Sequence, residues 1–336
     1  CRVSRSFIGV LPSGDVRVSL EQAGRAIRAH TRADAYPGPM PSLSKFLADN
    51  RALTEKEADW LQHLVGDWNL LSDLLRSDLV LWLAEDDGPL AVAHCRPATG
   101  STVYYEDPVG TVRTVGAEDA EGAEIARLLA GGEPSEEPTR IEREGRSATG
   151  VMVPVRKNGR TLAVLAAEAP ESDNDPSDNE THQRRLGARL LTMLQHGAFP
   201  IEGAPIPPRR GAPRVGDGVV ELDEAGVVQW TSPNARSAFH RFGIAGDMTG
   251  TTLAELSTEV LQSRSPVDES LPLVLMGRAA WRSDMQARGG TLSLRAVPLT
   301  DAGKRTGAVI LVRDVTELRR RERELITKDA TIREVH

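Results

Sequence analysis

The residues with the most evident chemistry are two neighbours, His94 and Cys95, because an imidazole and a thiol can each bind a metal or react. Adjacent side chains of a strand point to opposite faces, so the two would not share a metal without distortion. A thiolate near a cation could serve as a redox sensor, whereas an unpaired cysteine more often fills space in a core. No second cysteine or histidine stands at zinc-ligand spacing, so the sequence does not predict a zinc site.

Asn234 follows one predicted strand and opens a predicted helix. We expect its side chain to cap that helix or to tie the strand to it, in preference to contacting a ligand. The glycine pairs at 131–132 and 289–290 lack a G-x-G-x-x-G or phosphate-loop pattern, so no nucleotide cradle is predicted. No Ser/His/Asp set or pair of carboxylates stands out. The residues themselves therefore support no catalytic assignment.

The composition limits the partners and the location. The 336 residues carry a formal net charge of −7 and give a pI near 5.6, whereas nonspecific nucleic-acid binding requires a basic surface. No run approaches the length of a membrane span, and the first twenty residues lack the apolar block of a signal peptide. Two cysteines cannot form a disulfide framework. We therefore expect a cytoplasmic protein with no direct contact to nucleic acid or membrane.

The elements that position these residues are expected to form an α+β fold with two antiparallel-sheet domains. The first domain, residues 42–199, opens with a helix capped by the box Thr54 to Glu57 and closes with a helix that stops at Gly197. Its clearest hairpin turns at Asn158-Gly159. The strands expected here are 79–83, 90–95, 102–105, 151–155 and 161–167, with a helix at 123–130 in the otherwise loop-rich segment 106–150.

A second antiparallel sheet is expected over residues 217–314, after a proline-rich linker at 200–216. Two strands, short helices and three more strands give a sheet with its helices on one face. The expected strands are 218–222, 227–231, 281–287, 291–299 and 306–312. Residues 1–39 are rich in arginine and poor in large apolar side chains, and we expect them to form a disordered N-terminal extension.

The segment 315–336 is expected to be a signalling helix that leaves the second sheet. Leu318, Leu325 and Ile332 recur every seven residues, which is the spacing of one seam position in a two-stranded coiled coil. The other seam position is mostly polar, so the pairing would be weak: it reads Val315, Glu322 and Asp329.

Two further features of this segment bear on its role. The charges of residues 319–324 alternate in sign, which fits a solvated coiled-coil face better than a nucleic-acid site. Asp314 and Thr316 stand at the break between strand and helix, where their side chains can bond backbone groups. We expect these two residues to couple movement of the sheet to the helix.

This order of elements resembles known sensor modules. The first domain resembles a GAF domain and the second a PAS domain, whose junction with a signalling helix is similar to the D-V-T-E at 314–317. Five segments together resemble the PdtaS-type sensor histidine kinases of actinobacteria: WNLLSDLLRSDLVLWL, AHCRPATGSTV, DPVGTV, TSPNARSAFHR and ITKDATIREVH.

The resemblance implies the sensory region of a homodimeric kinase that autophosphorylates a histidine from ATP and Mg and passes phosphate to a response regulator with an RNA-binding antiterminator output. His336 resembles the residue just before the phosphate acceptor, so the acceptor and the ATP-binding domain are expected beyond it. This region alone is then expected to be inactive and to hold no cofactor. His240 stands where some PAS domains place a haem ligand, but a satisfied surface or core histidine is the commoner arrangement.

Other interpretations stay open at this point. The two domains could form a noncatalytic ligand-binding and dimerisation scaffold, or the regulatory half of a phosphatase or cyclase. They could also have lost ligand binding and serve dimerisation alone. The fold class does not name the stimulus, and the aromatic content of 4% disfavours a large flat cofactor.

Overall fold

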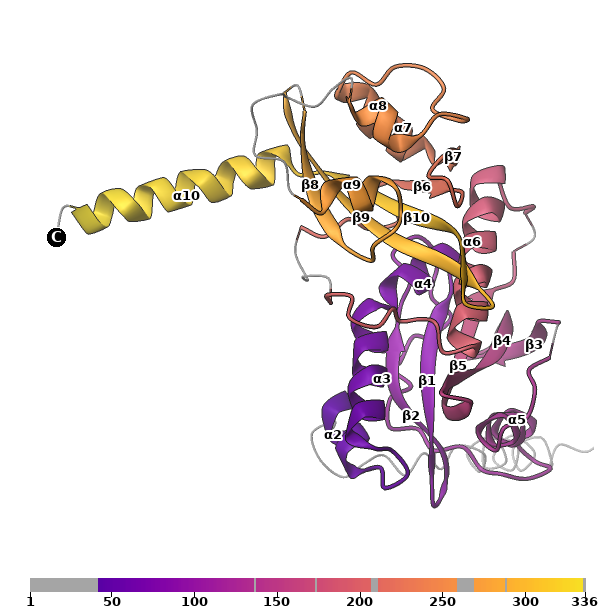
Figure 1. Ribbon diagram of the computed structural model, residues 1–336. Helices are drawn as coiled ribbons and strands as arrows, with labels where there is room; N and C mark the ends of the chain where they lie inside the picture. The colour runs from indigo at the N-terminus through magenta and orange to yellow at the C-terminus, as the bar shows by residue number, and fades with distance from the viewer. Residues whose placement is uncertain are drawn as a thin grey trace, which may run out of the picture. The chain divides into compact units, whose positions relative to one another are not determined.

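The structure is a computed structural model that describes residues 42–135, 137–172, 174–206, 211–258, 269–287 and 289–334. Within these ranges lie two antiparallel five-stranded sheets with helices packed on them (Figure 1). The α+β class predicted from the sequence is thereby confirmed. The expected N-terminal extension and His336 lie outside the described residues.

The first sheet has the strand order β2-β1-β5-β4-β3. Its hairpin turn at Asn158 and Gly159 has positive φ at both positions, 51° and 77°, as the tight turn predicted there requires. The strands are β1 (Asp78–Glu85), β2 (Gly88–Cys95), β3 (Thr139–Arg143), β4 (Arg146–Lys157) and β5 (Arg160–Pro170).

Helices cover both faces of this sheet, because alternate residues of its central strands are apolar on both sides. Along β1, the odd-numbered leucines belong to the core beneath α3, α4 and α6, and the residues between them belong to a second core with α5. The helices are α2 (Leu43–Asp49), α3 (Glu55–Asp67), α4 (Asn69–Leu75), α5 (Ala120–Leu129) and α6 (Asp178–Gln195). The predicted capping box of Thr54 and Glu57 is present, and Gly197 follows α6 with φ +72°.

The second sheet has the order β7-β6-β10-β9-β8. Its strands are β6 (Val219–Leu222), β7 (Val228–Thr231), β8 (Arg282–Ala287), β9 (Gly290–Asp301) and β10 (Lys304–Asp314). The short helices α7 (Pro233–Arg241), α8 (Leu253–Thr258) and α9 (Leu271–Leu275) belong to this domain. All five described strands of the second domain correspond to predicted ones.

The second sheet is buried on both faces. Along β10, Ala308, Ile310 and Val312 pack into the core with α7 and α9. Val309 and Leu311, on the opposite face, belong to the same hydrophobic cluster as the helices of the first domain. One apolar core therefore joins the two domains.

Three expectations about the first domain were wrong in detail. Residues 102–105 form no strand. The buried carboxylate of Asp78 accepts hydrogen bonds from the Thr102 hydroxyl and the Val103 N–H, so this N–H does not pair with a neighbouring strand. The strand β3 was not expected, since its sequence TRIER is polar. The helix predicted after Thr54 does not open the domain, because α2 precedes it, and it is divided at Trp68, where ψ is −10° instead of the roughly −42° of a regular helix.

The predicted C-terminal helix is α10 (Thr316–Glu334). Leu318 and Leu325 are 37% and 63% exposed, as seam residues of an unpaired helix would be, and the side chain of Ile332 lies outside the described ones. Pairing into a coiled coil stays a prediction. Of the helices in the described ranges, none combines the length and apolarity that crossing a membrane requires.

Candidate functional site

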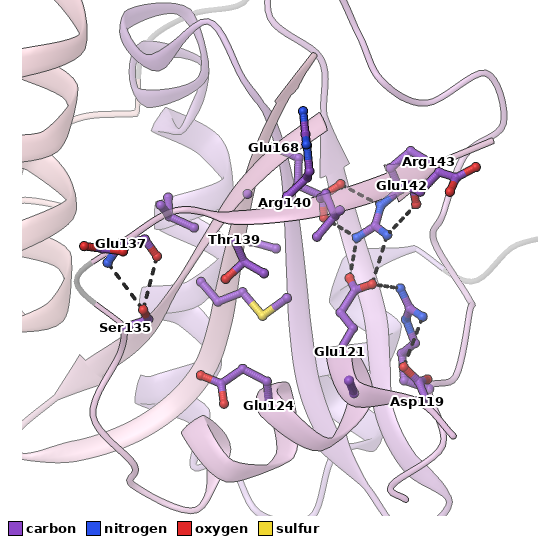
Figure 2. A pocket seen from close by; sticks show the side chains of 17 residues that line it. Asp119, Glu121, Glu124, Ser135, Glu137, Thr139, Arg140, Glu142, Arg143 and Glu168 are labelled. Carbon is purple, nitrogen blue, oxygen red and sulfur yellow. Dashed lines mark hydrogen bonds and ion pairs between the residues drawn. The ribbon is translucent and has the colours of Figure 1, made fainter. Parts of the chain in front are cut away.

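A cavity lies in the first domain, between α5 and the strands β3, β4 and β5 (Figure 2). Its volume is about 420 Å³, which is enough for a small organic molecule. Part of the wall is apolar and comes from Ile141, Val151, Met152 and Ala166. Nine of the other lining residues are charged. Such a combination of an apolar surface with a few fixed polar groups is typical of a ligand site.

Arg143 is the centre of the charged wall. Its Nε and Nη2 donate to the two carboxylate oxygens of Glu168, at 2.7 and 2.6 Å. Its Nη1 donates to Glu121 at 2.9 Å, and its Nε also donates to the Tyr104 hydroxyl at 3.1 Å. The side chains of Arg143 and Glu168 are only 10% and 1% exposed. This network is therefore a rigid, desolvated part of the wall.

Burial shifts the protonation equilibria of this network. Desolvation raises the pKa of Glu168, with the hydrogen bonds and charge of Arg143 acting against the shift. Desolvation and the neighbouring Glu168 charge raise the pKa of Tyr104, so its hydroxyl stays protonated at neutral pH. Burial alone would lower the pKa of Arg143, but pairing with Glu168 outweighs it and the pKa is raised. The geometry suits binding and orientation of a ligand.

The two other arginines of the cavity are also paired. Arg113 contacts the Asp119 carboxylate at 3.3 Å and makes a close ion pair with Glu121. Arg140 forms two hydrogen bonds to Glu171, each of 2.6 Å. Sequence reasoning missed this cavity, because its charged groups come from segments as far apart as α5 and β5. The sequence feature that came closest to indicating the cavity was the alternation of positive and negative charge in the TRIER sequence of β3.

His94 and Cys95 lie on opposite sides of β2, as adjacent strand residues do. The His94 Nε2 is 3.0 Å from Asp78 Oδ1, its Nδ1 is 3.7 Å from Asp107, and its side chain is 5% exposed. The ring also meets Tyr104 edge-on at 5.0 Å. His94 thus contacts the cavity network through Tyr104, and it helps to hold the segment that includes Asp107.

Cys95 faces the core under α4. Its thiol lies 3.2 Å from Asn69 Oδ1, and the residue is 7% exposed. Burial raises the pKa of the Cys95 thiol to about 11. This environment favours packing over reactivity, and a redox role stays a prediction. Within the described part of the chain, no group of three or more potential ligands is placed to hold a metal ion.

Asn234 does not cap its helix. Ser232 is the N-cap of α7, since its hydroxyl accepts from the Ala235 N–H, and Asn234 Nδ2 instead donates to the Gly216 carbonyl at 2.8 Å. The capping role expected of Asn234 was therefore wrong, because the serine two residues earlier occupies that position, and the Asn234 side chain ties the start of α7 to the segment ahead of β6 instead. His240 is exposed on α7 beside an open surface hollow, without the apolar enclosure that a haem ligand requires.

The joint between β10 and α10 has the hydrogen bonds expected of it. The Thr316 N–H and hydroxyl both donate to Asp314 Oδ1, at 3.1 and 2.7 Å. The Thr316 oxygen in turn accepts from the Thr291 N–H of β9 at 3.0 Å. A Cβ at Gly290 would lie 2.1 Å from that oxygen, so glycine is needed for this approach. One turn later, Arg319 pairs with Asp284 of β8 at 2.6 Å.

Comparisons with known proteins identify both domains. A family model described as the GAF domain of histidine kinase PdtaS matches residues 43–186, and one described as a PAS fold matches residues 213–320. A solved structure entitled "Sensor region of a sensor histidine kinase" is 34% identical with a TM-score of 0.69, and the alignment covers 83% of this chain and all of that one. The chain belongs to the PdtaS family of sensor histidine kinases.

Curated PdtaS relatives give the extent of the match. The sensor histidine kinase PdtaS of Mycobacterium tuberculosis is 39% identical over 309 residues, and that of Mycolicibacterium smegmatis is 36% identical over 303 residues. Each alignment covers 88% of this chain and 60% of the relative. The chain thus spans about three fifths of the length of these PdtaS proteins.

A polar clasp joins the GAF and PAS domains of this PdtaS-family chain. Glu221 of β6 has a side chain only 6% exposed, and it accepts from His182 Nε2 at 2.6 Å and from Arg189 Nη1 at 2.7 Å, both on α6. The His182 ring also stacks on Trp230 of β7, with centroids 4.2 Å apart. The spacing of basic residues along α6 and the lone carboxylate in the strand VVEL were the sequence signals that could have found it.

A second ion pair crosses the same boundary. Arg295 of β9 donates to Asp67 of α3 at 2.5 Å, and both side chains are about nine tenths buried. Together with the shared apolar core, the two polar contacts fix the face of the PAS sheet against the GAF helices. A change in the GAF domain therefore has a direct physical route to the PAS sheet.

Proposed function

We propose that this chain is the sensory half of a protein histidine kinase, in which a ligand of the GAF cavity sets the rate of autophosphorylation. The full protein would use ATP and Mg to phosphorylate a histidine as a cytoplasmic homodimer. It would then pass the phosphate to a response regulator, for which we propose an RNA-binding antiterminator output. These finer statements extend the family assignment and are supported by the identity to PdtaS relatives.

The observation that carries the proposal is a series of shared elements and contacts that leads from the cavity to the last helix. The strand β5 holds Glu168 in the cavity wall and leads to α6, which holds the clasp with Glu221. Glu221 pairs in register with Val309 of β10. That strand ends at Asp314, whose carboxylate fixes the start of α10.

The mechanism we propose is a shift between two populations of packing. A small change in the free-energy difference between two packing arrangements is enough for such a shift. About 1 kcal/mol already changes the ratio of the two populations roughly fivefold. A ligand that binds one arrangement of the GAF cavity better would favour it. The clasp and β10 would carry the change to α10, which would tighten or rotate against its counterpart in a dimer.

Substitutions at the joint test this proposal. In the full-length kinase, we expect Asp314→Ala to change the basal autophosphorylation rate by about fivefold or more, because two hydrogen bonds that fix the start of α10 are lost. Thr316→Val, which keeps the shape of the side chain, should act in the same direction. The measurement is incorporation of labelled phosphate from ATP.

The matched control is Asp301→Ala, at the exposed turn between β9 and β10. It should leave the rate unchanged. Rates for both joint variants equal to those of the wild type would contradict the proposed coupling.

A further inference from the structure

The GAF cavity also indicates what kind of molecule it takes, a point that depends on the proposed function of that cavity as the sensing site. Its apolar wall, made by Ile141, Val151, Met152 and Ala166, requires a ligand with an apolar body. The charged wall then determines whether the polar group of the ligand is positively or negatively charged. Three observations bear on the charge of that group.

The first is the number of charges. Among the described residues that line the cavity there are three arginines and six carboxylates. The arginines are Arg113, Arg140 and Arg143, and the carboxylates are Asp119, Glu121, Glu124, Glu137, Glu142 and Glu168. Six negative groups against three positive ones leave an excess of three negative charges. Opposite charge within a few ångströms is favoured in such a partly desolvated space, and like charge is disfavoured.

The second is that each of these guanidinium groups is already committed. In Arg143, Nε donates to Glu168, Nη1 donates to Glu121, and Nη2 donates to both carboxylates. Arg113 is held by Asp119 and Glu121, and Arg140 by Glu171. An anionic ligand bound by Arg113 or Arg143 would have to displace a largely buried carboxylate and leave it without a partner, which is costly.

The third is that carboxylates remain beyond those that the cavity arginines use. Figure 2 shows Glu121 and Glu124 both extending from α5, and only Glu121 is joined to an arginine of the cavity. Glu124 pairs with Arg127 of its own helix at 2.7 Å. Hydrogen bonding to Arg127 lowers the pKa of Glu124, so it stays ionised at neutral pH. Glu137 and Glu142 lie at the exposed rim.

We infer that the GAF cavity binds an organic cation, namely an amine, amidine or guanidine carried on an apolar body. The apolar part lies against Met152 and its neighbours, and the cationic group lies towards the carboxylates of α5 and the rim. A phosphate or carboxylate ligand is disfavoured, because the arginines that would receive it are occupied.

The test uses three rigid probes of nearly the same shape: benzamidine, benzamide and benzoate, which are positive, neutral and negative at pH 7. Binding to the 336-residue chain is measured by saturation-transfer NMR, and each protein is checked for folding by its thermal transition. We expect benzamidine to bind, benzamide to bind more weakly and benzoate not to bind.

Three variants locate the binding. Glu124→Gln should weaken benzamidine roughly two- to fivefold, as expected for loss of one partly exposed charge. Glu121→Gln frees part of Arg113 and Arg143, so it should weaken benzamidine and allow benzoate to bind. Glu133→Gln removes the same charge from an exposed residue that pairs with Arg156 outside the cavity, and it should have no effect.

Several outcomes would overturn the inference. These are tighter binding of benzoate than of benzamidine to the wild type, no binding of any probe, or an equal loss in the Glu124 and Glu133 variants, which would indicate attraction to the surface. None of them would bear on the kinase proposal, which is judged separately by the phosphorylation rates of the joint variants.

Discussion

Cys95 shows how position within a strand decides the chemistry of a residue. The thiol is packed under α4 near Asn69, and its pKa of about 11 leaves roughly one thiol in ten thousand ionised at pH 7. A buried thiol in this state reacts slowly even where the sequence makes it look reactive.

We therefore expect a Cys1→Ser variant, which retains Cys95 as its single cysteine, to react with iodoacetamide at pH 7 at least about 100-fold more slowly when folded than when unfolded in urea. The measurement is the rate of mass increase by alkylation. Equal rates in the two states would show that Cys95 is accessible and would restore the redox interpretation.

At the scale of single residues, local patterns were predictable and distant partners were not. The capping box of Thr54 and the turn at Asn158-Gly159 could be predicted because each depends on residues a few positions apart. The partners of Arg143 could not, since Glu121 and Glu168 are 22 and 25 residues away. Asn234 shows the limit of the local rules, because two good capping residues competed and Ser232 took the position.

Among the elements, α6 is the one that connects the cavity domain to the clasp, and its start depends on pH. A second capping box there joins Ser177 and Glu180. The hydrogen bond from the Ser177 N–H, and then the charge of Arg76, hold the pKa of Glu180 below its ordinary value of 4.5. The ionised Glu180 carboxylate therefore stabilises the folded state fully above pH 4.5. This stabilisation is lost as the pH falls through the lowered pKa of Glu180.

We expect Glu180→Gln to be less stable than the wild type at pH 7 and the difference to disappear as the pH falls below 4.5 towards 3. The measurement is the thermal midpoint as a function of pH. The control is Glu224→Gln, which removes a carboxylate that is 61% exposed. Its thermal midpoint should differ little from that of the wild type at any pH in this range. A difference for Glu180→Gln that persists at pH 3 would contradict the assignment.

The clasp between α6 and β6 can be measured by a double-mutant cycle. We expect Glu221→Gln to lower the free energy of unfolding by about 2 kcal/mol, because charged hydrogen bonds to a buried carboxylate are lost. His182→Ala should cost about 1 to 2 kcal/mol, since it also removes the stacking on Trp230. The double variant should cost less than the sum, by about 1 kcal/mol. Strict additivity would show that the two groups do not interact.

Element types were mostly predictable, and the misses have physical causes. The long strands β9 and β10 of the second sheet are largely apolar stretches bounded by turn residues, so their positions could be predicted. The polar β3 could not, because it is held by backbone pairing to β4 and not by an apolar face. Residues 102–105 have strand-like composition, but Asp78 binds them as a loop.

At the scale of the whole chain, the GAF and PAS domains should behave as one unit, because a single apolar cluster and the buried Asp67–Arg295 pair join them. Removing one partner of such a pair leaves the other charge buried, which costs about 3 to 5 kcal/mol. Replacing both by apolar residues is often neutral.

We therefore expect Arg295→Met to lower the free energy of unfolding by about 3 kcal/mol, and Asp67→Leu combined with Arg295→Met to recover most of it. Urea unfolding followed by circular dichroism and by tryptophan fluorescence should give one coincident transition for the wild type. Two separate transitions would show that the domains unfold independently. A double variant as unstable as the single one would contradict the assigned ion pair.

The order of the two sensor modules could be predicted from the sequence, whereas the way in which they pack could not. The contacts that join them include residues 228 positions apart in the case of Asp67 and Arg295. Periodicity shows that both faces of β10 are apolar, but it does not name the element that covers the second face.

That second covered face has a practical consequence for protein engineering. A chimeric receptor that takes only the PAS module would expose Val309 and Leu311 to water and would tend to aggregate. A chimera that also includes the GAF domain from ahead of α3 keeps the helices that cover Val309 and Leu311, and it should stay monodisperse. Exchange of input modules between kinases of this kind should therefore succeed with the tandem and fail with its second half alone.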